Sequence, residues 1–359
     1  MPNKKVDLPP GVLQPREAVL KMAPYNPPTG GRAHKLRLDF NENTVGASPK
    51  VIEFLRAHLN ETALAIYPEY DEVKRELAEF FEVEPDDFTL SNGTDEAIQV
   101  LINTYVDDGD EVLLLRPSYA MYRFYAEVAG ASVREIPYRA EKLAFPLDEL
   151  LEAIRPNTRA VLIANPNNPT GTGTSRAGIE RILEKATNAA VLLDEAYYEF
   201  CGVTALPLIN DYPNLFVSRT FSKVYGMAAM RLGCLFSQSG NVEFLRKAQS
   251  PYSVNSIAAL AARAAIQDQT YIQKYVMEVL AARELLYVGL EKLGIPYYES
   301  QANFVLFQAG QRAIGIRDEL RRRGVLVRDR SYEIDGCVRV TTGTREQIRK
   351  FLSQLEEIW

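Results

Sequence analysis

The sequence contains little cysteine, histidine or tryptophan, and these shortages exclude several kinds of site. Its 359 residues include three cysteines, two histidines and one tryptophan. An odd number of scattered cysteines argues against a disulfide framework. Neither histidine has the spacing to a cysteine that zinc ligands adopt, so we expect no metal site. The cysteines are Cys201, Cys234 and Cys337, and the histidines are His34 and His58.

Long apolar runs and an excess of positive charge are also missing. Nothing approaches the run of about 18 apolar residues that predicts a membrane-spanning helix. The net charge is −6, whereas a nucleic-acid-binding protein needs a basic surface, so the composition argues against nucleic-acid binding. The first residues, MPNKKVDLPPG, have no apolar stretch after their lysines, so they do not resemble a secretory signal. With 47% hydrophobic and 25% charged residues, the composition predicts a soluble, cytoplasmic protein.

The order of patterns along the chain predicts two domains preceded by an arm. Residues 1–46 are rich in proline and glycine, which indicates an extended arm lying over a surface. Short apolar runs then alternate with helical stretches, a pattern typical of an α/β fold with helices on both faces of a mostly parallel sheet. We expect this large domain, with a seven-stranded type of sheet, to span residues 47–260. A smaller α+β domain is expected over residues 261–359.

The expected strands of the large domain are short and rich in β-branched and aliphatic residues. Helical stretches separate most of them, near residues 94–106, 118–128, 147–154 and 176–187. A long helical region after the last strand is expected to break near Asp268. The apolar runs lie at residues 88–91, 111–116, 159–165, 190–195, 214–220 and 233–237.

One segment combines an amine, hydroxyl groups and a guanidinium at short spacing. In SRTFSKVYGMAAMRLG, residues 218–233, Lys223 follows Thr220 and Ser222 and precedes Arg231. These groups suit a site that holds a phosphate beside a lysine that attacks a carbonyl, because neighbours and burial activate an amine. A solvated lysine on a loop is the alternative for this segment taken alone, since lysine is mostly exposed.

Other candidate residues follow the ends of expected strands, where ligands gather in such sheets. Gly93 turns the chain after one strand, and Thr94 and Asp95 open a helix whose free N–H groups suit a phosphate. A simple helix cap is the alternative. Tyr119 follows the strand at 111–116 and either stacks on a flat ring or packs in the core.

Two further strand ends carry polar groups in apolar surroundings. Asn168, within ANPNNPTGTG, is a candidate donor to a ligand oxygen, since a turn alone would not need three amides. Asp194 ends the next strand, and Tyr197 lies one turn beyond it. A carboxylate there is costly without a cationic partner. A protonated ring nitrogen or a structural salt bridge would supply that partner.

The motifs NGTDE, PSYAMY, ANPNNPTG, DEAYYEF and SKVYGMAAMRLG stand in the order and spacing of a known family. The chain resembles the fold-type I pyridoxal phosphate aminotransferases, and among them most the histidinol-phosphate aminotransferase family. The resemblance covers nearly the whole chain, including LDFNENTVGASP near the start and VRDRSYEIDGCVRVTTGTRE near the end. It implies the aminotransferase fold, the cofactor pyridoxal 5'-phosphate, and exchange of the amine of histidinol phosphate with 2-oxoglutarate in histidine biosynthesis.

The resemblance also implies a role for each residue on the cofactor side. Lys223 would form a Schiff base with the cofactor and later move a proton. Asp194 would keep the pyridine nitrogen protonated, so that the ring acts as an electron sink. Tyr197 and Asn168 would bind the phenolic oxygen, and Tyr119 would stack on the ring. The cofactor phosphate would be held by Gly93, Thr94, Asp95, Thr220, Ser222 and Arg231.

On the substrate side, the resemblance implies that arginines bind the anionic group of the substrate. Arg339, in CVRVTTG, would bind it directly, and Arg328, in LVRD, would assist. Tyr25 and Asn43 complete this part of the family pattern. Tyr67, in IYPE, would reach the cofactor phosphate of a neighbouring subunit, which implies a homodimer. The partners expected are thus a small-molecule amino donor, a 2-oxo acid and a second copy of the chain.

The chain departs from the family pattern near the expected substrate entrance. Residues 44–46 read Thr-Val-Gly where the family has a proline-containing turn, and the arm reads PYNPPTGG. An aromatic amino acid aminotransferase and a threonine-phosphate decarboxylase therefore stay open as alternatives on the same scaffold. A non-catalytic binding protein is a third alternative, against which the presence of Lys223 argues.

Overall fold

Seven strands form the central sheet of the computed structural model, which describes residues 12–24, 28 and 30–359. The expected substrate residue Tyr25 lies outside the described residues. The strands are β2 (Phe88–Ser91), β3 (Glu111–Arg116), β4 (Ser132–Pro137), β5 (Thr158–Ala164), β6 (Ala190–Asp194), β7 (Leu215–Thr220) and β8 (Gly233–Phe236).

The sheet is mostly parallel, as the alternation of strands and helices predicts. Its order is β2-β8-β7-β6-β5-β3-β4, and only β8 runs antiparallel to its neighbours. Six of the strands match the apolar runs in the sequence. The seventh, β4, has the sequence SVREIP and pairs only with β3 at the edge of the sheet. Its polar composition suits an edge strand and explains why no apolar run marks it.

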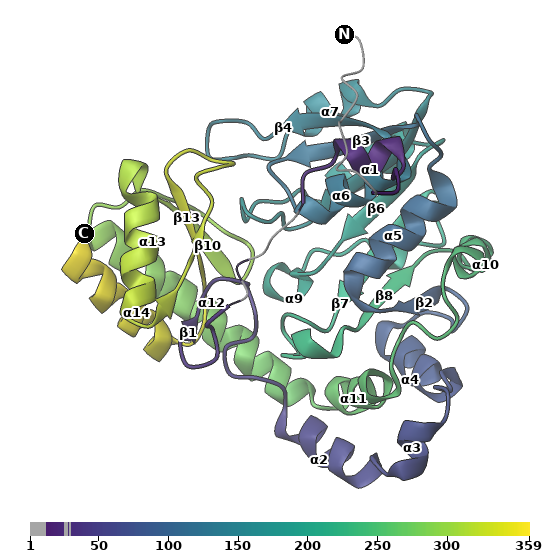
Figure 1. The fold of residues 1–359 in the computed structure, drawn as a ribbon, viewed down its shortest axis with the longest axis horizontal. Coiled ribbons are helices and arrows are strands. Elements are labelled where there is room, and N and C mark those ends of the chain that lie inside the picture. The colour runs from purple at the N-terminus through teal and green to yellow at the C-terminus, as the bar shows by residue number, and fades with distance from the viewer. Residues whose placement is uncertain (1–11, 25–27, 29) are drawn as a thin grey trace.

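The inner strands are buried on both faces, which explains their near-continuous apolar sequences. In β5, Val161 and Ile163 pack into one core, whereas Ala160 and Leu162 pack into another. Helices cover each face, and Figure 1 shows this layered arrangement. The first core is covered by α2 (Pro49–His58), α4 (Asp71–Phe81), α7 (Leu147–Ala153), α8 (Arg176–Lys185) and α11 (Ser256–Gln267), and the second by α5 (Gly93–Tyr105), α6 (Ala120–Ala129) and α10 (Ser239–Ala248).

A long helix, α12 (Gln269–Lys292), joins the large unit to the smaller one. It begins after Asp268, where the sequence predicts a break from α11. Val279 still packs in the first core of the sheet, whereas Ala282 belongs to the core of the smaller unit. The change of core therefore falls inside α12, later in the chain than residue 261. The domain boundary expected at residue 261 stays a prediction.

The smaller unit combines an antiparallel sheet with helices that pack on α12. The sheet has the order β12-β13-β10-β9. In Figure 1 it lies between its helices and the carboxyl ends of the large sheet. Its strands are β9 (Tyr297–Tyr298), β10 (Phe304–Gln308), β12 (Arg328–Asp329) and β13 (Cys337–Thr341), and its helices are α13 (Ala313–Arg322) and α14 (Arg345–Ile358).

The segment after residue 35 does not lie over a surface, contrary to the expectation of an arm up to residue 46. β1 (Leu36–Arg37) pairs in parallel with β11 (Val325–Leu326). Leu38 is fully buried in the core of the smaller unit, and its carbonyl accepts a hydrogen bond from the Thr341 N–H at 2.9 Å. A two-residue strand is too short to show periodicity, so the sequence gives no sign of this pairing.

The remaining described elements are short. They are α1 (Glu17–Lys21), which lies against α6, α3 (Glu61–Ala65), α9 (Tyr198–Cys201) and the 3-10 turns Leu206–Leu208, Ala228–Met230 and Gly310–Arg312. Among the described residues, no helix combines the length and the apolar character needed to cross a bilayer.

Candidate active site

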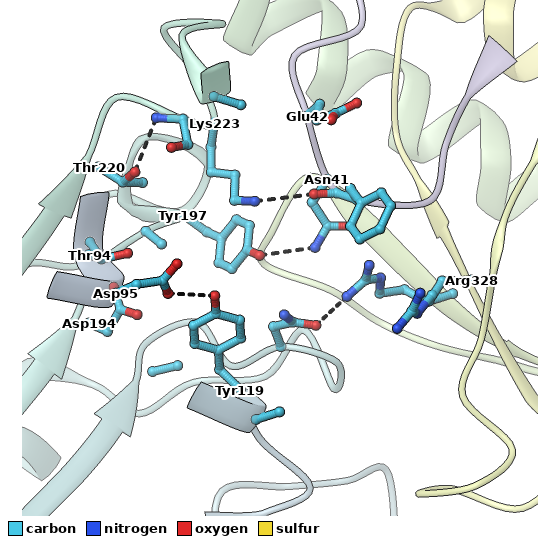
Figure 2. A pocket seen from close by; sticks show the side chains of 18 of the residues that line it. Asn41, Glu42, Thr94, Asp95, Tyr119, Asp194, Tyr197, Thr220, Lys223 and Arg328 are labelled. Carbon is cyan, nitrogen blue, oxygen red and sulfur yellow. Dashed lines mark hydrogen bonds between the residues drawn. The ribbon is translucent and has the colours of Figure 1, made fainter. Parts of the chain in front are cut away.

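A cavity of about 640 Å³ opens between the carboxyl ends of the large sheet and the smaller unit. Figure 2 shows Lys223 reaching into it from the loop after β7, with Tyr197 below its amine and Arg328 on the far side. The Nζ atom of Lys223 donates a hydrogen bond to the carbonyl of Phe40 at 3.1 Å. Lys223 is thus held at the cavity by a neutral acceptor and forms no ion pair with any described residue.

The backbone around Lys223 is fixed on both sides. The Ser222 N–H donates to Thr220 Oγ1 at 3.1 Å, and the Asn43 side-chain amide donates to the carbonyl of Val224 at 2.8 Å. Asn43 also accepts hydrogen bonds from the N–H groups of residues 45 and 46. Its side chain does not line the cavity, so a role of Asn43 in substrate binding stays a prediction. The side chain supports the loop of Lys223.

Asp194 lies at the end of β6 with its carboxylate buried. It accepts hydrogen bonds from the hydroxyls of Tyr122 at 2.8 Å and Ser218 at 3.0 Å. Burial raises the pKa of Asp194, and these two donors act in the opposite direction. Among the described residues Asp194 forms no salt bridge, so the structural ion pair considered from the sequence is absent. The carboxylate is therefore available for a cationic ligand group.

Tyr197 joins the two sides of the cavity. Its hydroxyl accepts a hydrogen bond from Asn41 Nδ2 at 3.0 Å, and the centre of its ring lies 5.9 Å from Lys223 Nζ. Asn41 is buried and has a φ of 56°, a left-handed conformation that asparagine tolerates. Its backbone N–H donates to Thr341 Oγ1 at 3.0 Å. The sequence pattern NEN drew attention to Asn43, and the structure identifies Asn41 as the asparagine at the cavity.

The N-terminus of α5 forms one end of the cavity with Arg231. Arg231 Nη2 lies 3.2 Å from a carboxylate oxygen of Asp95, and the Tyr119 hydroxyl donates to the other oxygen at 2.7 Å. Gly93 has a φ of 76°, and a Cβ atom there would lie 2.3 Å from Arg231 Nη2. Glycine at this position therefore leaves the space that the guanidinium occupies. Thr94, Thr220 and Ser222 line the same cavity.

Arginines of the smaller unit form the opposite wall. Arg339 is 4% exposed; its Nη1 contacts Asn168 Oδ1, and its Nη2 donates to the carbonyl of Asp39 at 2.6 Å. Burial, aided by the nearby charge of Arg330, lowers the pKa of Arg339 to about 10, so it keeps its charge at neutral pH. Arg328 lies 5.5 Å from the centre of the Phe40 ring and forms no ion pair with any described residue.

Charged residues near the entrance balance one another. Arg32 binds the carboxylates of Asp39 and Glu42, and Arg37 binds Glu42 as well. Burial tends to raise the pKa of Glu42, but the hydrogen bonds and charges of Arg32 and Arg37 outweigh it and lower that pKa. Arg32 and Glu42 line the cavity, as does Arg330, and none of the three was singled out from the sequence.

Tyr67 is the one expected cofactor residue, among those described, that lies away from the cavity. It is 74% exposed in the loop after α3, and its ring stacks on that of Tyr252 with centroids 4.5 Å apart. Its role at the cofactor phosphate of a neighbouring subunit stays a prediction. The other expected residues converge as the motifs imply: Lys223, Asp194, Tyr197, Tyr119, Asn168, Thr94, Asp95, Thr220, Ser222, Arg231, Arg328 and Arg339 all line the cavity, and Gly93 borders it.

A lysine, a buried carboxylate and a helix N-terminus beside an arginine gather at the carboxyl edge of this sheet, an arrangement that suits a transferase with a phosphate-bearing cofactor. Comparison with known families matches residues 33–355 to aminotransferase class I and II. The chain belongs to this family.

Its relatives include named enzymes of similar length. The histidinol-phosphate aminotransferase of Symbiobacterium thermophilum is 36% identical over 355 residues, covering 95% of this chain and 97% of that protein. The histidinol-phosphate aminotransferase of Thermococcus gammatolerans is also 36% identical, covering 95% and 96%. Among solved structures, histidinol-phosphate aminotransferase from Sinorhizobium meliloti in complex with pyridoxal-5'-phosphate aligns with a TM-score of 0.85 at 26% identity, covering 95% of this chain and 96% of that chain.

The described residues fit pyridoxal phosphate, the cofactor of this family. The buried carboxylate of Asp194 has only neutral hydroxyl partners, and a protonated ring nitrogen would compensate its charge. The space left by the missing Cβ of Gly93 places Arg231 beside the N-terminus of α5, where backbone N–H groups favour a phosphate. Lys223 lines the same cavity and would supply an amine for the aldehyde of that cofactor.

Proposed function

We propose that this aminotransferase exchanges the amine of L-histidinol phosphate with 2-oxoglutarate, giving imidazole-acetol phosphate and glutamate. The observation that carries the proposal is the pair Arg328 and Arg339 on the wall opposite Lys223, two guanidinium groups with no carboxylate partner among the described residues. Arginine binds phosphate and carboxylate groups with paired N–H donors, so one wall suits both substrates. The names of the relatives support the same assignment.

Residues of this chain would divide the work as follows. Pyridoxal phosphate, when bound, withdraws electrons and stabilises negative charge on the substrate carbon that loses a proton. Lys223 Nζ moves that proton, because it is the one amine described at the cavity. Asp194 holds the proton on the ring nitrogen through its buried negative charge. Tyr197, oriented by Asn41, presents a polar group to the cofactor.

The substrate anion is held on the other wall. Asn168 contacts Arg339 through Oδ1, which fixes the direction of the guanidinium and leaves Nδ2 of the amide without a partner among the described residues. Nδ2 is thus available as a donor on the cofactor side. Binding the anion between Arg328 and Arg339 orients the amine toward Lys223, and such positioning accounts for a large share of rate enhancement.

Incubation of the purified protein with imidazole-acetol phosphate and glutamate tests this proposal. Formation of 2-oxoglutarate is the expected result. No turnover of this pair, together with turnover of phenylalanine or tyrosine, would reassign the protein as an aromatic amino acid aminotransferase. Release of carbon dioxide from phosphothreonine would reassign it as a decarboxylase.

We also propose that the protein acts as a homodimer in the cytoplasm. Tyr67, Leu64, Ile66 and Tyr252 place large apolar groups in solvent, with exposed fractions of 74%, 67%, 56% and 55%. Exposed apolar patches of this kind mark interaction sites. Sedimentation should show a dimer in the wild type and a larger monomer fraction in Ile66→Glu. A monomeric wild type would refute the dimer and, with it, the role of Tyr67 in a neighbouring site.

A further inference from the structure

A third arginine and its carboxylate partner lie on the anion-binding wall. Arg330 follows β12 directly, is 7% exposed and lines the cavity with Arg328 and Arg339. Its Nη2 forms an ion pair with Glu333, and its Nη1 donates to the Tyr332 hydroxyl at 2.9 Å. Both of these partners also line the cavity.

The backbone of this hairpin holds Arg330 in place. Its N–H donates to the carbonyl of Cys337 at 2.9 Å, and its carbonyl accepts from the N–H groups of Glu333 at 3.0 Å and Ile334 at 2.9 Å. The Nε atoms of Arg330 and Arg339 are buried without a hydrogen-bond partner among the described residues. Buried donors are normally satisfied, and an anion held by Arg339 would supply an acceptor at this wall.

The charges on the wall can be added up. Arg328, Arg330 and Arg339 contribute three positive charges and Glu333 one negative charge, which leaves +2. The nearby carboxylates do not alter this sum. Those of Asp39 and Glu42 are matched by Arg32 and Arg37, and Asp329 does not line the cavity and lies 3.8 Å from Arg317.

We propose that Glu333, paired with Arg330, is a specificity-determining residue that sets the charge of this wall and thereby the balance between phosphate and carboxylate ligands. The inference rests on the proposed function in placing both substrate anions here. A phosphate monoester carries nearly two negative charges at neutral pH and a carboxylate carries one. Coulomb energy scales with ligand charge, so a change in wall charge affects phosphate about twice as strongly in free energy. By lowering the positive charge of the wall, Glu333 thus keeps phosphate binding from becoming so much stronger than carboxylate binding that the carboxylate substrate is excluded.

Binding of inorganic phosphate and of acetate to the cofactor-loaded enzyme tests this inference. With the cofactor bound, inorganic phosphate cannot occupy the place of the cofactor phosphate. Glu333→Gln raises the wall charge to +3, and we expect about 3-fold tighter acetate binding and about 10-fold tighter phosphate binding by calorimetry at low salt. Arg330→Gln lowers the charge to +1 and should weaken both ligands in the same ratio.

The double variant Arg330→Gln with Glu333→Gln restores the sum to +2. Phosphate affinity close to that of the wild type would support the inference. A double variant as weak as Arg330→Gln would overturn it, because Arg330 would then bind the anion directly. Unchanged affinities in Glu333→Gln would overturn it as well.

The control is Glu357→Gln, which changes the net charge of the protein equally. Glu357 pairs with Arg323 on the surface of the smaller unit, away from the cavity. This variant should bind both anions as the wild type does. Because these measurements need no turnover, a wild type that fails to convert histidinol phosphate would refute the proposed function and leave the charge inference to be decided by the binding ratios.

Discussion

The two walls of the cavity differ in how their charged groups are satisfied. On the large-sheet wall, each carboxylate has a partner. The hydroxyls of Tyr122 and Ser218 donate to Asp194, and Arg231 forms an ion pair with Asp95. All of these groups come from the strands of the large sheet and from the helices and loops that connect them. The wall is therefore built before any ligand arrives.

On the opposite wall, positive charge exceeds negative charge. Arg328 and Arg339 have no carboxylate partner among the described residues, and Arg330 has one. These side chains come from β12, β13 and the hairpin between them. The difference suits a division in which residues of the sheet hold the cofactor and, as we propose, a small hairpin whose charge a single substitution changes sets the specificity.

Lys223→Ala should produce the largest effect, because Lys223 is the one lysine that the described residues place at the cavity. Turnover should fall on the order of 10²–10⁴-fold, the range for loss of a general acid–base group. The variant should still bind the cofactor through the other groups of the large-sheet wall but form no covalent bond with it. Visible absorbance and the mass after borohydride reduction measure this bond. A variant that keeps both signals and normal turnover would refute the assignment.

Gly93→Ala should have the second largest effect. It tests whether the position of Arg231 at the N-terminus of α5 depends on the missing Cβ of Gly93. The new atom would lie 2.3 Å from Arg231 Nη2, so the guanidinium must move and cofactor affinity should fall about 10-fold. Gly202→Ala is the matched control, since Gly202 has a similar φ of 73° and no atom within 4 Å of its ideal Cβ. Both variants should lose about 1 kcal/mol of stability from the left-handed backbone. Equal cofactor affinities in the two variants would contradict the role of Gly93 in placing Arg231 for phosphate binding.

Much of the large-sheet wall could be predicted from the sequence because its residues follow strand ends at short spacing. Asp194, Tyr197 and Lys223 are each found this way. Ser218 and Tyr122 were missed, since one lies inside an apolar strand and the other on an aromatic helix face. A signal for Ser218 existed: β6 and β7 are neighbours, and their register pairs Asp194 with Ser218. Without knowing that register, a buried serine cannot be assigned to a site.

The opposite wall could be predicted only in part, for a physical reason. Arg328 and Arg339 lie on strands that the apolar pattern marks, whereas Arg330 lies in a hairpin whose turns decide where its side chain points. Likewise, the segment NEN has no periodicity, so the choice between Asn41 and Asn43 depends on the positive φ of Asn41 and on its contact with Thr341. Such tertiary contacts leave no trace in local sequence.

Asn41→Ala should have a smaller effect, because it removes one hydrogen bond that links the two walls. Asn41 Nδ2 donates to the Tyr197 hydroxyl, and Asn41 Oδ1 accepts from the Thr341 hydroxyl. The substitution therefore removes a side chain that connects the two walls. A net loss of about 1 kcal/mol corresponds to a decrease in kcat of roughly 5-fold. In a Tyr197→Phe background the same substitution should change kcat no further. Additive losses in the double variant would show that Asn41 acts through another group.

Asp194→Asn in the cofactor-free protein should give the smallest effect, a pH-dependent change in thermal stability. Burial raises the pKa of Asp194, so the folded state binds this proton more tightly than the unfolded state. The contribution of Asp194 to stability is therefore full below its ordinary pKa and is lost as pH rises through the raised pKa. Asparagine has no such dependence.

The melting temperature of Asp194→Asn should accordingly rise relative to the wild type as the pH rises above the ordinary pKa of aspartate, about 4, by about 2 °C. The buried Glu195 and the half-buried Glu199 also have raised pKa values, but both are present in both proteins and cancel in the difference. Addition of pyridoxal phosphate should reverse the order at high pH, because the charged carboxylate then has its cationic partner. A difference that stays constant with pH, or the same order with and without cofactor, would contradict the view that this wall holds a buried negative charge prepared for the ring nitrogen.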